Sequence, residues 1–67
     1  MGGSMTAPTY TLAVGSARGA VWHWLDPVTW RASWQVVRFE HMGPNRVLGT
    51  FDRAEPALAM WRAEVER

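Results

Sequence analysis

The sequence contains no cysteine, no lysine and no long apolar run. Without cysteine the chain has no disulfide, no thiolate metal ligand and no thiol nucleophile, and nothing in it marks an oxidising compartment. No stretch reaches the roughly 18 apolar residues that a membrane-spanning helix needs, and the pattern of a secretory signal peptide is missing. We therefore expect a cytoplasmic protein.

Net charge is small as well, at +1, which does not predict nucleic-acid binding from bulk electrostatics. All seven basic residues are arginine. This bias fits a GC-rich coding sequence, but arginine is also the side chain best suited to bidentate contacts with phosphate or guanine. The composition therefore leaves nucleic acid open as a partner.

The chain has 67 residues, which is enough for one small domain near the lower limit of independent folding. Residues 1–4 precede a second methionine, Met5, and have the composition of an expression scar. We exclude them from the fold and expect a single domain over residues 5–67.

Tryptophan is unusually frequent for so short a chain, with five residues: Trp22, Trp24, Trp30, Trp34 and Trp61. Each side chain can bury on the order of 150 to 250 Å², so a core of this size does not enclose all five. Core and rim packing explains most of them. Trp22 and Trp24 are the candidates for an exposed patch that contacts a partner, because interface anchors are enriched in tryptophan and arginine.

The first part of the chain predicts a β-hairpin. Residues 9–14 alternate, with Tyr10, Leu12 and Val14 on one face, as in a half-buried strand. The glycines at both ends of residues 15–19 predict a turn, and residues 20–25 return as a second strand. The Asp26-Pro27 dipeptide ends that strand, because proline has no N–H to donate.

Residues 29–41 fit either a strand or a helix. Trp30, Trp34 and Val37 have helical spacing, but the segment is rich in β-favouring residues and alternates, so we predict a strand. A β-bulge at Val36-Val37 would restore the alternation and would point Trp30 inward. The bulge would leave one polar face on this strand, made of Arg31, Ser33, Gln35, Arg38 and Glu40.

The last third predicts a strand that passes through a tight joint into a helix. Residues 46–51 read as the strand, and Asp52 with Glu55 three positions later matches a capping box, although Pro56 disturbs the first turn. An apolar stripe then follows at helical spacing: Ala54, Leu58, Trp61 and Val65. The fold class is α+β, a three- to four-stranded antiparallel sheet packed against one C-terminal helix.

The joint Leu48-Gly49-Thr50-Phe51-Asp52, with an aromatic at Trp61, resembles the plant ethylene-response-factor DNA-binding domain and the related arm-type DNA-binding domains of integrases. The resemblance covers about residues 20–65, and Gly49, Phe51, Asp52, Leu58 and Trp61 would have structural roles in it. It implies a sheet in the DNA major groove, with contacts from Arg31, Arg38, Arg46 and Trp30. The chain departs from the family at Pro56, and it has Trp22-His23-Trp24 where a basic strand is expected.

A second resemblance concerns the first half of the chain. Trp24 and Trp34 with Gln35-Val36-Val37 are spaced like the tryptophan pair of MbtH-like proteins, small adaptors of nonribosomal peptide synthetases. This resemblance implies a protein partner. The polar signature of that family and its carboxyl-terminal motif are missing here.

Catalytic chemistry is not indicated by the sequence. His23 and His41 do not have the spacing of a metal site, and there is no nucleophile elbow, phosphate-binding glycine loop or spaced carboxylate pair. We expect no enzyme activity, no metal and no cofactor. The sequence predicts a binding module for double-stranded DNA through an arginine-bearing sheet face, or alternatively a protein-interaction domain, homodimeric or adaptor-like, that uses a tryptophan-rich surface.

Overall fold

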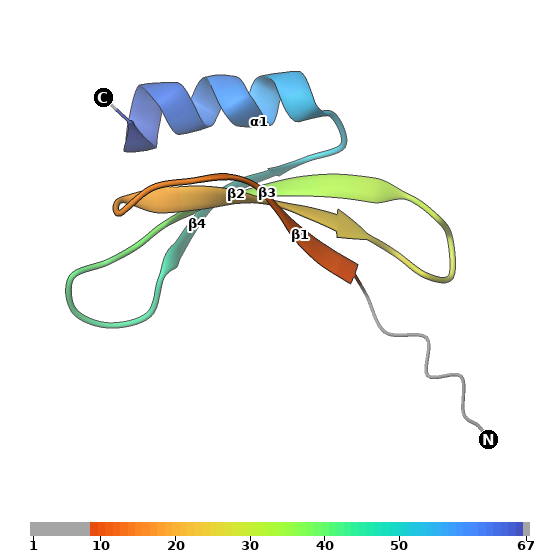
Figure 1. Cartoon of the computed structure of the whole chain (residues 1–67), viewed down its shortest axis with the longest axis horizontal. Helices are drawn as coiled ribbons and strands as arrows, with labels where there is room; N and C mark the ends of the chain where they lie inside the picture. The colour runs from red at the N-terminus through yellow and green to blue at the C-terminus, as the bar shows by residue number, and fades with distance from the viewer. Residues whose placement is uncertain (1–8, 67) are drawn as a thin grey trace.

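The structure is a computed structural model that describes residues 9–66. It has four strands, which pair in sequence order as one antiparallel sheet, and they are β1 (Thr9–Gly15), β2 (Gly19–Leu25), β3 (Ala32–Arg38) and β4 (Arg46–Phe51). A helix follows, made of α1 (Ala54–Met60) and a π-helical turn, η1 (Trp61–Val65). The helix covers one face of the sheet, as Figure 1 shows. The predicted α+β class is confirmed, and the strand in residues 29–41 is confirmed over Ala32–Arg38.

Pairing between strands assigns each side chain to one of two faces, because residues that oppose each other across a sheet point to the same side. Val21 opposes Val36, and Val36 opposes Gly49, on the side covered by the helix. The side chains in the alternate positions lie on the other side, which we call the open face. Its residues are Tyr10, Leu12, Ala20, Trp22, Trp24, Ser33, Gln35, Val37, Val47 and Thr50.

The bulge expected in β3 lies in β4 instead. Val36 opposes Gly49 and Val37 opposes Val47, so Leu48 is the extra residue, while β3 pairs with β2 without interruption. Val36 and Val37 can both be buried because they point to opposite faces of an unbroken strand. The correction moves Arg38 to the helix side, away from Ser33 and Gln35.

A second irregularity occurs in β1, where the register shifts between Leu12 and Val14. Ala13 is therefore the extra residue, and Val14 turns to the helix side while Leu12 stays on the open face. The prediction that Tyr10, Leu12 and Val14 share a face is wrong for Val14. The bulge provides one more apolar side chain for a small core.

The core lies between the sheet and the helix and is centred on Val21, Val36, Ala57 and Val65. Half-buried apolar side chains surround these four, among them Trp34, Phe51, Leu58 and Trp61. At the end of the helix, Glu66 N–H donates to the Trp61 carbonyl at 2.9 Å, the spacing that defines a π turn. The Glu66 carboxylate accepts a hydrogen bond from Ser16 Oγ at 2.6 Å, which joins the helix end to the β1–β2 turn.

The joint between β4 and α1 is close to the one predicted, apart from its cap. A Cβ on Gly49 would lie 3.2 Å from Met60 Sδ, so glycine allows the helix to approach β4. The helix begins at Ala54 with Arg53 in the capping position and no side-chain cap, so the expected cap by Asp52 is not formed. Pro56 is the third helical residue, where the N–H has no partner within the helix anyway.

The single helix is too short for a membrane span, and residues 9–66 contain no other candidate for one.

The loop between β2 and β3 is organised by Asp26. Its carboxylate accepts hydrogen bonds from the N–H groups of Val28, at 2.8 Å, and Thr29, at 3.3 Å. Its carbonyl accepts one from Trp30 N–H at 2.8 Å. Trp30 lies in this loop with φ of 61° and a side chain that is 73% exposed, so the expectation of an inward Trp30 is wrong. A left-handed conformation is unfavourable for a bulky residue.

Trp30→Asn should therefore stabilise the domain. Asparagine tolerates the left-handed region, and the exposed indole contributes little packing, so we expect a gain of about 1 kcal/mol and a rise in Tm of about 4 to 8 °C. Thermal denaturation followed by circular dichroism measures this. Val28→Asn, in the same loop at a residue that is 79% exposed, is the control and should change Tm by less than about 3 °C. An equal or larger gain from the control would contradict the conformational explanation.

Candidate functional site

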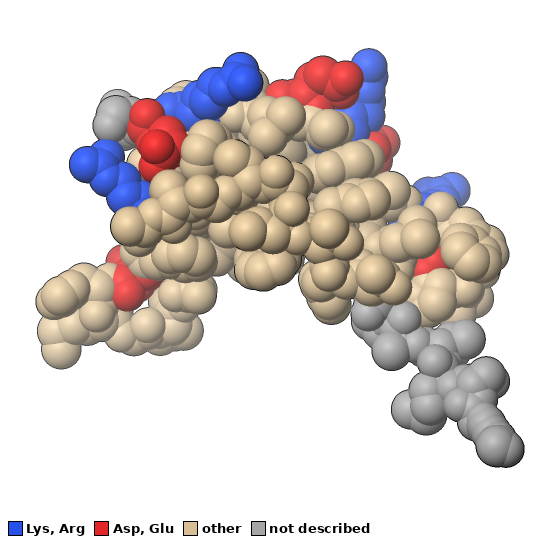
Figure 2. Space-filling view, viewed as in Figure 1, with Lys and Arg blue, Asp and Glu red and all other residues tan. Residues whose placement is uncertain are grey.

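The open face is the most distinctive surface of the molecule, because no helix covers it and Tyr10, Leu12 and Val47 are more than half exposed there. Figure 1 shows that the β2–β3 and β3–β4 loops bend away from the helix, and in the space-filling view of Figure 2 the surface between them is concave. Its ten positions carry no charged residue. In Figure 2 arginines and carboxylates gather mainly on the helix side, and the surface between the two loops is largely uncharged.

A shallow trough runs across this face. One hollow of about 370 Å³ is lined by Trp22, Val37 and Val47, and a second of about 180 Å³ by Trp24, Ser33 and Thr50. Both hollows are also lined by Tyr10 and Gln35, so they adjoin. The trough combines apolar walls with a few neutral hydrogen-bonding groups, which is the composition of many binding surfaces.

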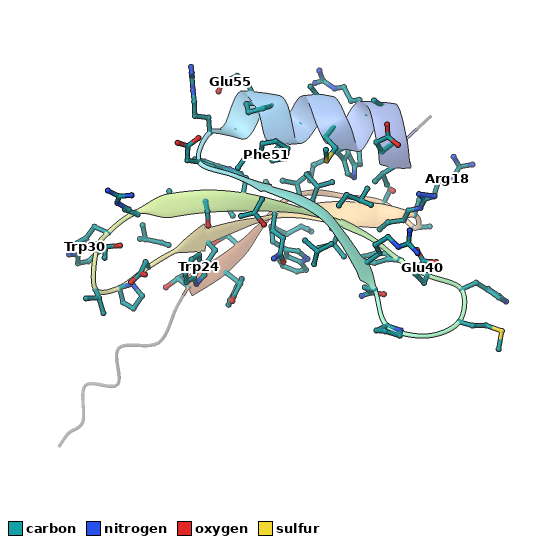
Figure 3. All side chains as sticks on the ribbon, turned by 180° about the vertical axis from the view of Figure 1, so that it is seen from behind. Arg18, Trp24, Trp30, Glu40, Phe51 and Glu55 are labelled. Carbon is teal, nitrogen blue, oxygen red and sulfur yellow. The ribbon has the colours of Figure 1, made fainter. Side chains whose placement is uncertain are left out.

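The aromatic part of the trough is preorganised. The Tyr10 and Trp24 rings stack with centroids 6.2 Å apart and an interplanar angle of 25°. Figure 3 shows Trp24 on the side of the sheet away from α1, and Phe51 between the sheet and the helix. The Trp24 Nε1 atom is buried and has no hydrogen-bond acceptor within residues 9–66. Stacking restricts the rotamers of both rings, so a ligand would lose little side-chain entropy on contact.

The five tryptophans thus divide between the two faces and a loop. Trp22 and Trp24 lie on the open face, as proposed from the sequence, whereas Trp34 and Trp61 pack at the edge of the core. Trp34 also stacks on His23, with ring centroids 4.7 Å apart. Trp30 is exposed at the end of the β2–β3 loop, beyond β3.

Tyr10, Gln35 and Val47 belong to the trough but were not among the residues singled out from the sequence. The hairpin register that opposes Tyr10 to Trp24 is the signal that identifies Tyr10. It depends on the bulge at Ala13, because the turn pairs Gly15 with Ala20 and the shift of one residue then opposes Tyr10 to Trp24. Gln35 is assigned to the trough by its pairing with Trp22, and Val47 becomes recognisable only when the bulge at Leu48 is known.

The three arginines nominated for DNA contact do not form one row. Arg38 opposes Arg46 on the helix side of the sheet, whereas Arg31 precedes β3, about 23 Å along that strand from Arg38. Arg31 lines a hollow together with Asp26, Asp52 and the open-face residues Trp24 and Ser33, so it borders the trough beside two carboxylates. None of the three lies among the open-face positions given by the strand register.

Acidic side chains accompany Arg38 and Arg46. Arg46 Nε lies 3.8 Å from a carboxylate oxygen of Glu40, and Glu40 and Glu64 line the same groove as Arg18 and Arg38. Figure 3 shows Arg18 and Glu40 close together at the end of the sheet opposite Trp30. Mixed charge of this kind attracts phosphate less than a purely basic cluster does.

Neither histidine belongs to a cluster that would hold a metal, since residues 9–66 contain no group of three or more suitable His, Asp or Glu side chains. His23 is half-buried on the helix side, and His41 is exposed in the β3–β4 loop.

Comparison of the chain with models of protein families, with curated proteins and with solved structures finds no match in any of the three. Both family resemblances therefore stay predictions, and the concave, uncharged open face is the candidate site.

Proposed function

We propose that this domain is a non-enzymatic binding module that holds a segment of another protein in the trough of its open face. The observation that carries the proposal is a concave face with Tyr10, Trp22 and Trp24 along its trough and no charge at any of its paired positions. Exposed aromatic surface of this kind costs solubility, and it is typical of interaction sites.

The chemistry of the face favours an apolar, uncharged segment as the bound group. Indole and phenol rings would contact apolar side chains, and Gln35, Ser33 and Thr50 would exchange hydrogen bonds with peptide groups. Double-stranded DNA is the alternative partner. It requires cations that face the phosphates, and here Arg38 and Arg46 lie on the helix side with Glu40 and Glu64 nearby.

Paired affinity captures from a lysate of the source organism test the proposal. The double variant Val47→Lys/Thr50→Lys adds two charges to the trough through exposed side chains of an outer strand, so the fold should persist. We expect a protein captured by the wild type to be lost. Ala59→Lys, on the exposed side of α1, is the matched control and should retain it.

The captured protein is then purified and titrated calorimetrically. The trough variant should raise Kd by at least about tenfold, equivalent to roughly 1.4 kcal/mol, while Ala59→Lys leaves Kd within about twofold. Equal loss of binding in both variants would reject the open face as the site.

A mobility-shift assay with random duplex DNA at low salt is the other arm. If the wild type shifts DNA at micromolar concentration and Arg31→Ala, Arg38→Ala and Arg46→Ala each weaken the shift, DNA is the partner and the protein-binding proposal is wrong. Binding through phosphates would also fall steeply with salt, because each contact releases counterions.

A further inference from the structure

The outer edge of β1 is open to solvent along its whole length. β1 is the first strand in the sheet order and pairs only with β2. Six of its seven residues are exposed. The helix packs mainly against β2, β3 and β4, and of β1 only Val14, near the end of the strand, packs against the core beneath it. The backbone N–H and C=O groups on the outer side of β1 are therefore a template for pairing with another strand.

β1 also lacks most of the features that protect edge strands. Thr9–Gly15 contains no charged residue and no proline, and its side chains are mainly threonine, tyrosine and leucine, which favour strands. Its single irregularity is at Ala13, near the end. The other outer strand, β4, begins at Arg46, which lies beside Glu40, and it is interrupted by the bulge at Leu48. The two edges differ, and only β1 has a regular, neutral stretch.

We propose that two copies of this chain dimerise by antiparallel pairing of β1 with β1, forming a continuous eight-stranded sheet. A two-fold axis makes such a pair isologous, so that each residue meets its counterpart in the other copy. The axis passes beside Thr11, which opposes Thr11 of the other copy. This dimer goes beyond the proposed binding function and does not depend on what the trough holds.

The register follows from the faces and from the length of the regular strand. Antiparallel partners must point to the same side, so the axis passes beside a residue and not between two residues. An axis at Tyr10 would bring in the segment before β1, which includes Pro8, and proline cannot donate to a ladder. An axis at Leu12 would place the bulge at Ala13 within the new ladder. An axis at Thr11 pairs Tyr10 with Leu12 and Thr9 with Ala13, so the new ladder stays within residues 9–13 and the bulge residue lies at its end.

Side chains agree with this register. Tyr10 would oppose Leu12 of the other copy on the open face, giving two aromatic–aliphatic pairs related by symmetry, and both residues are more than half exposed in the single chain. Thr11 would oppose its counterpart on the helix side, and threonine pairs are favourable in this position. The two troughs would then lie side by side, so that a dimer presents both to one partner.

Charge at the axis provides the test. Sedimentation velocity should show the wild type passing from monomer to dimer as the protein concentration rises from about 10 µM to about 1 mM. Pairing residues 9–13 of each copy makes a small interface, and small interfaces are at the weak end of specific contacts. Thr11→Lys places two like charges opposite each other, and Thr11→Glu does the same. Each variant alone should remain monomeric over that range. An equimolar mixture of the two should dimerise, because lysine then opposes glutamate.

Thr50→Lys is the matched control, with the same substitution at an exposed position on β4. It should dimerise like the wild type even though it weakens binding in the trough, whereas Thr11→Lys should bind the trough partner as a monomer. Circular dichroism verifies that every variant is folded. A wild type that stays monomeric at about 1 mM, a Thr11→Lys variant that still dimerises, or a mixture that stays monomeric would each overturn the proposal. Loss of the dimer in Thr50→Lys would overturn it as well.

Discussion

Gly19→Ala is expected to lower the free energy of unfolding by about 3 kcal/mol or more, the largest effect we predict for a single added methyl group. A Cβ at this position would lie 2.3 Å from the Val37 carbonyl oxygen and 2.8 Å from Val65 Cγ1. The first contact is with backbone in the neighbouring strand, which cannot rotate aside. The strands β2 and β3 would have to separate where the end of the helix packs on them.

This loss is large relative to the stability of the whole domain. For 67 residues a typical free energy of unfolding is about 3 to 10 kcal/mol, so the variant should be partly unfolded at 25 °C or should melt at least about 12 °C below the wild type. Urea denaturation followed by tryptophan fluorescence measures the change.

Gly15→Ala is the control, since Gly15 lies at the other end of the same turn. A Cβ there would come close only to the end of the Leu12 side chain, at 3.2 Å, which is 52% exposed and free to move, and it would meet Ala20 Cβ at an ordinary contact distance of 3.7 Å. Replacing glycine also removes conformational freedom from the unfolded chain, so the net change should stay within about 1 kcal/mol. Similar losses in both variants would show that the close approach at Gly19 does not limit stability.

Ala57→Leu is expected to cost about 1 to 3 kcal/mol, because Ala57 is fully buried where the helix contacts the sheet. It packs in a cluster with Val21, Val36 and Val65, and a leucine side chain would push α1 away from β3 and β4. Thermal unfolding should show a Tm lower by about 4 °C at least. The helical content of the remaining folded protein should not change.

Ala59→Leu provides the comparison within the same helix, two residues away. Ala59 is exposed, and leucine forms helices almost as well as alanine, so we expect a change within about 0.5 kcal/mol. An equal loss in Ala59→Leu would mean that bulk anywhere on α1 is harmful. The contact at Ala57 would then not limit how close the helix lies to the sheet.

The fold class was predictable because local signals agree with one another. Alternation over residues 9–14, glycines on both sides of the first turn and the apolar stripe through Leu58, Trp61 and Val65 all indicate sheet followed by helix. Ala57, the most buried helical residue, was missed because a small side chain carries little weight in a hydrophobic pattern. It is buried because its size lets the helix lie close to β3 and β4.

The candidate site was only half predictable. Trp22 and Trp24 were placed on a partner-facing surface, which agrees with their positions on the open face, although their binding role stays a prediction. Arg31, Arg38 and Arg46 were expected on one face, and the structure separates them. Arg38 lies on the helix side because β3 lacks the bulge expected at Val36-Val37, and a shift of one residue moves every later side chain of a strand to the other side of the sheet.

The sequence by itself determined that this chain forms an antiparallel sheet with one helix, since periodicity, turn residues and breakers act over short distances along the chain. Only the tertiary structure decided which face the helix covers, that Arg38 and Arg46 lie on the covered side, and that the opposite face is concave and aromatic with no charge at its paired positions. The reason is that the faces of strands are assigned by pairing. The bulges at Ala13 and Leu48 are located by what must be buried beneath the helix, and the sequence of one strand does not contain that information.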